Sequence, residues 1–130
     1  MAKSNSFQPY ALSVLRLVAG FTFCLHGFQK IFGFFGGLDG HKAAMFSLFW
    51  FAGVLELVGG LLIAVGLFTR LAAFVVCGEM AVAYFRAHYP HGFWPIANGG
   101  EEAVLYCFIF LLLLSAGAGP ISFDRAFRGK

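Results

Sequence analysis

The sequence predicts an all-α integral membrane protein, a bundle of four transmembrane helices with both termini in the cytoplasm. Hydrophobic residues make up 60% of the 130 residues and charged residues only 12%. A soluble domain has about 25% charged residues, so most of this surface is expected to face a lipid bilayer. The apolar residues form four segments close to the roughly 20 residues that span a membrane. One domain, 1–130, is expected, with no separate soluble part.

Helices are predicted at about 11–35, 43–68, 71–88 and 101–118. The first apolar run is too long for a signal-peptide core and no Ala-x-Ala site ends it, so it is expected to be retained. Arg70 closes the second segment, and Pro90 and Gly119 follow the third and the fourth, as is typical of helix ends. Asn98, with Glu101 three residues later, predicts a capping box at the start of the last helix.

Cations flanking the segments predict the orientation of the bundle. One end collects Lys3, Arg70, Arg125, Arg128 and Lys130, and the other collects Lys30, Lys42 and Arg86. Lysine and arginine are enriched on the cytoplasmic side of membrane proteins. The larger group therefore predicts that both termini are cytoplasmic.

Glycines in the second segment predict a close contact between helices. The segment contains Gly53, Gly59, Gly60 and Gly66. Glycine lets two helix backbones approach closely in lipid. We therefore expect this face of the second helix to pack against a neighbour.

Three charged residues lie inside the apolar segments: Arg16 in the first, Glu56 in the second and Glu79 in the third. A charge within a membrane helix is unfavourable unless it is paired, so each is a functional candidate. The predicted arrangement is a buried ion-pair network in which Arg16 pairs with Glu79 or with Glu56. Two interpretations remain open. The pairs either only fix which helices touch, or they form a polar site for a ligand or a proton path.

A second group of polar residues lies at the opposite ends of the helices. The predicted ligand-binding residues are His26, Lys30, Arg86 and Glu101. With four helices that alternate in direction, one membrane face contains the end of the first helix, the end of the third and the start of the fourth. Polar groups from three helices are therefore expected to converge there.

Several kinds of site are not predicted. Cys24, Cys77 and Cys107 form no Cys-x-x-Cys pair, so neither a redox dithiol nor a zinc site is indicated, and no metal site is expected. Phosphate-loop, catalytic-triad and dinucleotide motifs do not occur, and no catalytic residue is assigned. Scattered cations argue against a nucleic-acid partner.

Short motifs occur in a fixed order along the chain. They are Arg16-Leu-Val-Ala-Gly20, His26-Gly-Phe-Gln-Lys30-Ile31, Glu56-Leu-Val-Gly-Gly60, Gly66-Leu-Phe-Thr-Arg70, Asn98-Gly-Gly-Glu101, a Gly-x-Gly-Pro ending at Pro120 and Ser122-x-Asp124. Through these motifs and the four-helix frame, the chain from Leu12 to Phe123 resembles the DoxX family.

The resemblance implies a multi-pass protein of the bacterial inner membrane that is linked to redox chemistry. The related DoxD protein is a subunit of a thiosulfate:quinone oxidoreductase, and other relatives are associated with quinone or catechol stress. The resemblance thus implies a quinone as the ligand. The sequence has no haem-type ligand pair, iron–sulfur cysteine set or dithiol, so no covalently bound cofactor is expected, and the protein is expected to act as a homo-oligomer or with a partner redox subunit.

The sequence interpretation is therefore a membrane subunit that binds a quinone-type ligand between its helices. If it is enzymatic, it is expected to be a subunit of a quinone-linked oxidoreductase. One alternative is a non-enzymatic assembly or partner-binding subunit. A second is a small transporter or proton conductor that uses Glu56 and Glu79.

Overall fold

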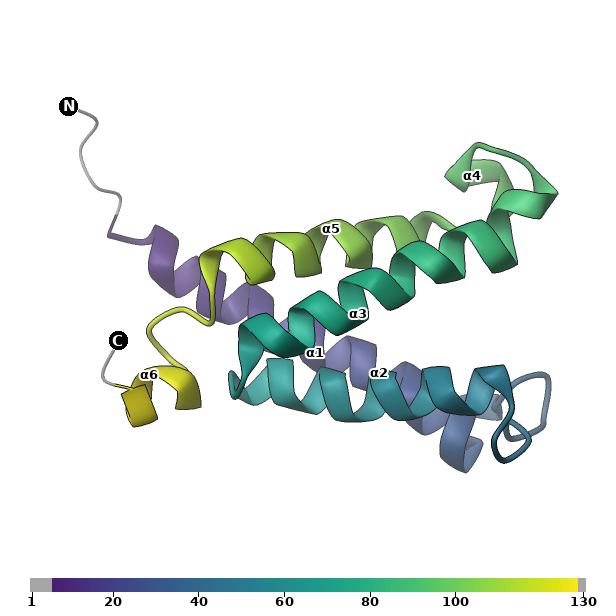
Figure 1. The fold of residues 1–130 in the computed structure, drawn as a ribbon, viewed down its shortest axis with the longest axis horizontal. Coiled ribbons are helices and arrows are strands. Elements are labelled where there is room, and N and C mark those ends of the chain that lie inside the picture. The colour runs from purple at the N-terminus through teal and green to yellow at the C-terminus, as the bar shows by residue number, and fades with distance from the viewer. Residues whose placement is uncertain (1–5, 129–130) are drawn as a thin grey trace.

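The computed structural model describes residues 6–128, which form helices joined by loops and contain no strand (Figure 1). The elements are α1 (Gln8–Phe32), η1 (Phe34–Gly36), α2 (Leu48–Val65), α3 (Thr69–Ala83), η2 (Tyr84–His88), η3 (Tyr89–His91), α4 (Pro95–Asn98), α5 (Glu101–Ala116) and α6 (Phe123–Arg128). The all-α class is confirmed. Lys3 and Lys130, two of the cations used to predict the orientation, lie outside the described residues.

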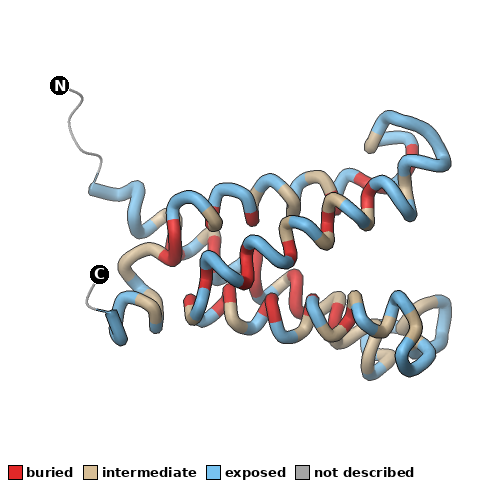
Figure 2. The backbone as a smooth tube through the Cα atoms, in the orientation of Figure 1, coloured by how far each residue is buried: buried red, intermediate tan, exposed pale blue. Residues whose placement is uncertain are grey.

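The four long helices form two antiparallel pairs. α1 packs along α2, and α3 packs along α5. The pairs lie close together where α3 and α6 begin and diverge toward the end that carries α4 (Figure 1). Figure 2 shows the buried residues along the inner faces, whereas the outer faces are exposed. Large apolar side chains such as Leu17, Phe74 and Phe108 lie on those outer faces, as expected of a surface in lipid.

Within residues 6–128, three helices are long and apolar enough to cross a membrane: Gln8–Phe32, Leu48–Val65 and the continuous stretch Thr69–His91. α5 has 16 residues, which at about 1.5 Å per residue gives about 24 Å. The hydrocarbon core of a bilayer is about 30 Å thick. A multi-pass membrane protein is therefore supported, while the fourth crossing and the cytoplasmic location of both termini stay predictions.

Several predicted helix boundaries need correction. The first helix ends at Phe32, before the predicted 35, because Gly33 adopts a left-handed conformation (φ 74°). The second begins at Leu48, after the predicted 43, where the Ser47 hydroxyl accepts a hydrogen bond from the Trp50 amide (3.2 Å).

The capping box at the last helix was also a wrong prediction. The N-cap of α5 is Gly100, and Asn98 instead ends α4, where its Oδ1 accepts a hydrogen bond from the Gly100 amide (2.8 Å). The helix ends at Ala116, short of the predicted 118, because Gly117 has a positive φ of 85°.

Glycines bring α1 and α2 into backbone contact. A Cβ added at Gly20 would lie 2.4 Å from the backbone nitrogen of Ala64, and one added at Gly60 would lie 2.6 Å from that of Cys24. Such distances leave no room for any side chain. The predicted helix contact is confirmed for Gly53, Gly59 and Gly60, which are buried in α2, while Gly66 caps the helix at φ 74°.

Candidate functional site

A cavity of about 600 Å³ lies between the two helix pairs, in the half of the bundle where they diverge. Its apolar walls are Phe23, Leu48, Phe49, Ala52, Met80, Val82, Ala83, Ala87 and Ala103. Its polar lining is His26, Lys30, Glu56, Glu79, Arg86, His88, Glu102 and Tyr106. The volume is in the range of small-molecule sites, which combine apolar walls with a few polar groups.

An ion pair between α1 and α2 forms one wall of the cavity. Lys30 Nζ donates to Oε1 (2.8 Å) and Oε2 (2.6 Å) of Glu56. The side chains are 15% and 4% exposed. Gly53 makes room for the lysine, because a Cβ there would lie 2.9 Å from Lys30 Cβ. An ammonium group has three donors, so one N–H of Lys30 remains available to a ligand.

Glu79 of α3 brings a second carboxyl group to the same place. It lies close enough to Glu56 and Lys30 to interact with both electrostatically. Both of its oxygens are nevertheless buried without a hydrogen-bond partner among the described residues. Buried polar groups are normally hydrogen-bonded. A carboxyl group that lines a cavity without a partner is therefore positioned to accept a hydrogen bond from a ligand.

His26 and Tyr106 line the side of the cavity next to α5. His26 Nε2 lies 3.8 Å from Glu102 Oε2, and the rings of His26 and Tyr106 meet edge-to-face with centroids 5.9 Å apart. The Tyr106 hydroxyl donates to Thr22 Oγ1 of α1 (3.1 Å). This contact joins the two helix pairs beside the cavity.

Three of the four predicted ligand-binding residues line the cavity, namely His26, Lys30 and Arg86. Glu101 is exposed and does not line it; its neighbour Glu102 does. Helix geometry could have found the correct residue, because Glu102 and Tyr106 are four positions apart and share a face. A functional role for the predicted residues stays a prediction.

The predicted pairing of Arg16 with Glu56 or Glu79 is wrong. Arg16 Nη2 donates to the Ile121 carbonyl (2.6 Å), and the residue is only 3% exposed. The reason is the antiparallel register of α1 and α2, in which Gly20 lies against Ala64 and Gly27 against Leu57. That register places Lys30 opposite Glu56.

At the other end of α1, the same register brings Arg16 to the end of α2. Its guanidinium packs on Gly66, where an added Cβ would meet Nη1. The C-terminal segment then covers it through Ile121 and Ser122, and Asp124 interacts with it electrostatically. Arg16 is therefore not part of the cavity.

Sequence reasoning missed a thiol pair. Cys77 of α3 and Cys107 of α5 have their Sγ atoms 3.8 Å apart, and Cys77 Sγ donates to the Cys107 carbonyl (3.3 Å). A search for Cys-x-x-Cys cannot detect two cysteines on different helices. Within residues 6–128, no group of three or more His, Cys, Asp or Glu side chains could hold a metal ion.

Comparisons with known proteins give a consistent result. The family model described as DoxX matches residues 11–89. A protein of Haemophilus influenzae, described as uncharacterized, is 42% identical over the full length of both chains. An uncharacterized membrane protein of Mycobacterium tuberculosis is 31% identical, covering 90% of this chain and 81% of its own. No solved structure matches the chain significantly.

Proposed function

This chain belongs to the DoxX family of membrane proteins, and from that premise we propose that it binds a quinone-type ligand in the cavity between its two helix pairs. The observation that carries the proposal is the lining of the cavity. Apolar walls surround one ion pair with a free donor and one carboxyl group without a partner.

The polar groups match the two chemical states of such a ligand. A quinone has a flat apolar ring with carbonyl oxygens that accept hydrogen bonds, and its reduced form has hydroxyls that donate them. Lys30 Nζ supplies the donor, and Glu79 supplies the acceptor on the facing helix. A quinone takes up two electrons and two protons when it is reduced to the hydroquinone.

His26 is the group that would exchange protons with the surroundings. It lines the cavity, is half-buried and lies beside Glu102, which is exposed. A neutral imidazole has one nitrogen that donates a hydrogen bond and one that accepts one. In this proposal His26 relays protons between the ligand and Glu102, with Nε2 as the nitrogen on the side of Glu102, while Lys30 and Glu56 hold the ligand in place.

The wider proposal is a redox or oxidative-stress subunit of the bacterial inner membrane, acting as a homo-oligomer or with a partner redox subunit. Membership of the family supports this proposal, and so does a cavity of a size and polarity that suit the ligand. The proposal does not require electrons to pass through the chain itself. A partner-binding or assembly subunit and a proton conductor through Glu56 and Glu79 are the competing interpretations.

The proposed topology is four crossings with both termini in the cytoplasm. α1 begins and α5 ends at the same end of the bundle (Figure 1), and three arginines of that end, Arg70, Arg125 and Arg128, are in the described residues. Reporter fusions after residue 130 and in the loop of residues 36–42 should report opposite sides of the membrane. Reports from the same side would reject this topology.

The ligand is tested with purified protein in detergent. We expect the protein to retain a quinone that solvent extraction and mass spectrometry detect, and to bind an added short-chain naphthoquinone. The matched control ligand is the naphthalene that carries the same chain without the two oxygens, which should bind at least about tenfold more weakly, since hydrogen bonds to charged groups contribute about 1.5–3 kcal/mol each. Equal binding of both would show partitioning into apolar surface, and no binding of either would favour the competing interpretations.

A further inference from the structure

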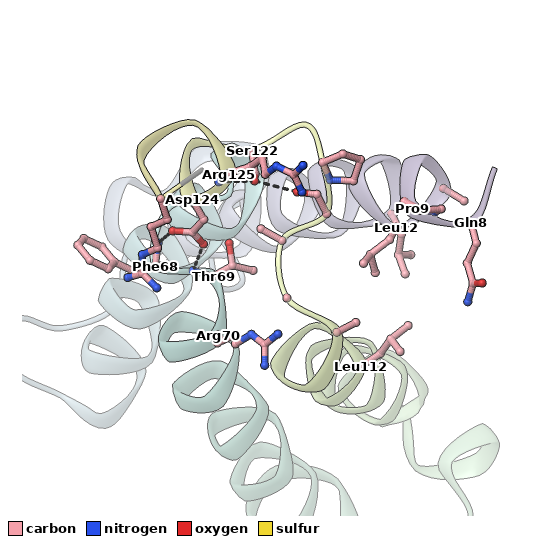
Figure 3. A pocket seen from close by; sticks show the side chains of 18 of the residues that line it. Gln8, Pro9, Leu12, Phe68, Thr69, Arg70, Leu112, Ser122, Asp124 and Arg125 are labelled. Carbon is pink, nitrogen blue, oxygen red and sulfur yellow. Dashed lines mark hydrogen bonds between the residues drawn. The ribbon is translucent and has the colours of Figure 1, made fainter. Parts of the chain in front are cut away.

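A second, larger cavity of about 1150 Å³ lies at the opposite end of the bundle, where α1 and α3 begin and α5 ends (Figure 3). The C-terminal segment and α6 complete it. It shares no lining residue with the cavity proposed for the quinone. A role for this second cavity therefore does not depend on the function proposed for the first.

Three arginines line this cavity: Arg70 from α3, with Arg125 and Arg128 from α6. Arg70 lies along the backbone at the end of α5, where a Cβ added at Gly117 would lie 3.2 Å from its Nε and Nη2 (Figure 3). Among the described residues, the guanidinium groups of Arg70 and Arg125 have no acceptor. Both residues are exposed, so their donors are free to meet a ligand.

The one carboxylate in the lining, Asp124, is already engaged. It accepts hydrogen bonds from the backbone amides of Phe68 (2.8 Å), the N-cap of α3, and Thr69 (2.9 Å), its first residue (Figure 3). Burial alone would raise the pKa of the Asp124 carboxyl, but the hydrogen bonds from Thr69 and Phe68 and the charge of Arg128 outweigh it and lower the pKa. The aspartate anchors α6 without neutralising Arg70 or Arg125.

The rest of the lining is mostly apolar, with Gln8, Thr69 and Ser122 as its other polar side chains. Leu12 and Leu15 of α1, Leu71 of α3 and Leu112 of α5 face the cavity, and Figure 3 shows Leu12 and Leu112 on opposite sides of the space. Arginines at the end of a membrane helix bundle and leucines farther along it match the two parts of a lipid. Guanidinium groups bind phosphate through paired hydrogen bonds, and acyl chains pack on leucine.

We propose that this cavity is a binding site for the phosphate of an anionic phospholipid, held by Arg70 and Arg125, with an acyl chain against the leucines. Arg128 adds positive charge beside Asp124. Basic residues at the end of a membrane helix bundle are attracted to anionic lipid headgroups. The same phosphate chemistry would also admit free phosphate, and the experiment separates the two.

The test titrates the purified full-length chain in detergent with phosphatidylglycerol, phosphatidylcholine or inorganic phosphate, and counts bound molecules by native mass spectrometry. We expect tighter binding of phosphatidylglycerol than of phosphatidylcholine. Arg70→Gln and Arg125→Gln should each weaken phosphatidylglycerol binding about five- to tenfold. Lys42→Gln, the same change of charge at an exposed position at the far end of the bundle, should leave it unchanged.

Several outcomes would overturn the proposal. Equal binding of the two lipids would show that anionic charge is not recognised, and unchanged binding in the arginine variants would place the lipid elsewhere. Competition by inorganic phosphate at the concentration where lipid binds would reassign the cavity to a soluble anion. Both arginines are exposed, so the variants are expected to fold, which their unfolding temperature in detergent would verify.

Discussion

Replacing Lys30 by methionine should lower the free energy of unfolding by about 3–5 kcal/mol, the largest effect expected of a single substitution in this chain. The ammonium contacts both oxygens of Glu56, which is only 4% exposed. Methionine preserves much of the volume but removes the charge. It leaves the Glu56 carboxyl buried next to Glu79 without a cation. Reversible unfolding in mixed micelles measures the loss.

Two further variants separate the ion pair from a general effect of removing lysine. Lys30→Met combined with Glu56→Gln leaves no uncompensated charge on either partner, so it should recover more than half of the lost stability. Lys42→Met changes an exposed lysine without an ion-pair partner in the described part of the chain and should have an effect within about 0.5 kcal/mol. Wild-type stability of Lys30→Met itself would contradict the buried pair.

Gly20→Ala should destabilise the protein by about 1–3 kcal/mol or more. The added methyl would lie 2.4 Å from the backbone nitrogen of Ala64 and 2.8 Å from the Gly60 carbonyl oxygen. Neither neighbour is a flexible side chain, so α1 and α2 must move apart. The same unfolding measurement reports the change.

The control for this substitution is Gly78→Ala in α3. Gly78 is exposed, and a Cβ there meets nothing within 4 Å. Alanine is the better helix former by about 0.8–1 kcal/mol, so this variant should be as stable as the wild type or more so. If the two alanine variants lose equal stability, the backbone contact between α1 and α2 is not what makes Gly20 necessary.

The two ends of the bundle have different chemistry, and the register between α1 and α2 produces the difference. The register places Glu56 of α2 opposite Lys30 at the end where the helix pairs diverge. It leaves Arg16 to be covered by the C-terminal segment at the other end. One arginine and one lysine of the same helix therefore serve different purposes, one securing the chain terminus and the other lining a cavity.

Apolar length and charge were sufficient to predict an all-α membrane protein, because both are properties of a single segment. Helix ends were less predictable, since they depend on local events such as the positive φ at Gly33 and the cap at Ser47. A left-handed glycine after a helix is a common stop. Gly33 fits this rule and indicates that the first helix ends at Phe32.

Side-chain partners were the least predictable feature. Glu56 and Glu79 lie beside charged groups of other helices, as expected because burying an unpaired charge in lipid is unfavourable, whereas Arg16 is covered by the C-terminal segment. The register between two helices decides which charged side chains pair. This register cannot be read from the sequence of either helix alone. For the same reason Cys77 and Cys107, 30 positions apart, gave no sign of their contact.

The central claim is that the cavity between the helix pairs binds a quinone. The most direct test is to measure how tightly two glutamate variants bind the reduced form, a hydroquinone. Glu79 lines the cavity with its oxygens unpartnered, whereas Glu101 is exposed and lies outside it. Glu79→Leu should weaken binding of the short-chain naphthohydroquinone about tenfold, because it leaves a buried hydroxyl of the ligand without its acceptor, and Glu101→Leu should bind as the wild type does. Wild-type affinity in both variants, or no binding to any of the three proteins, would contradict the claim.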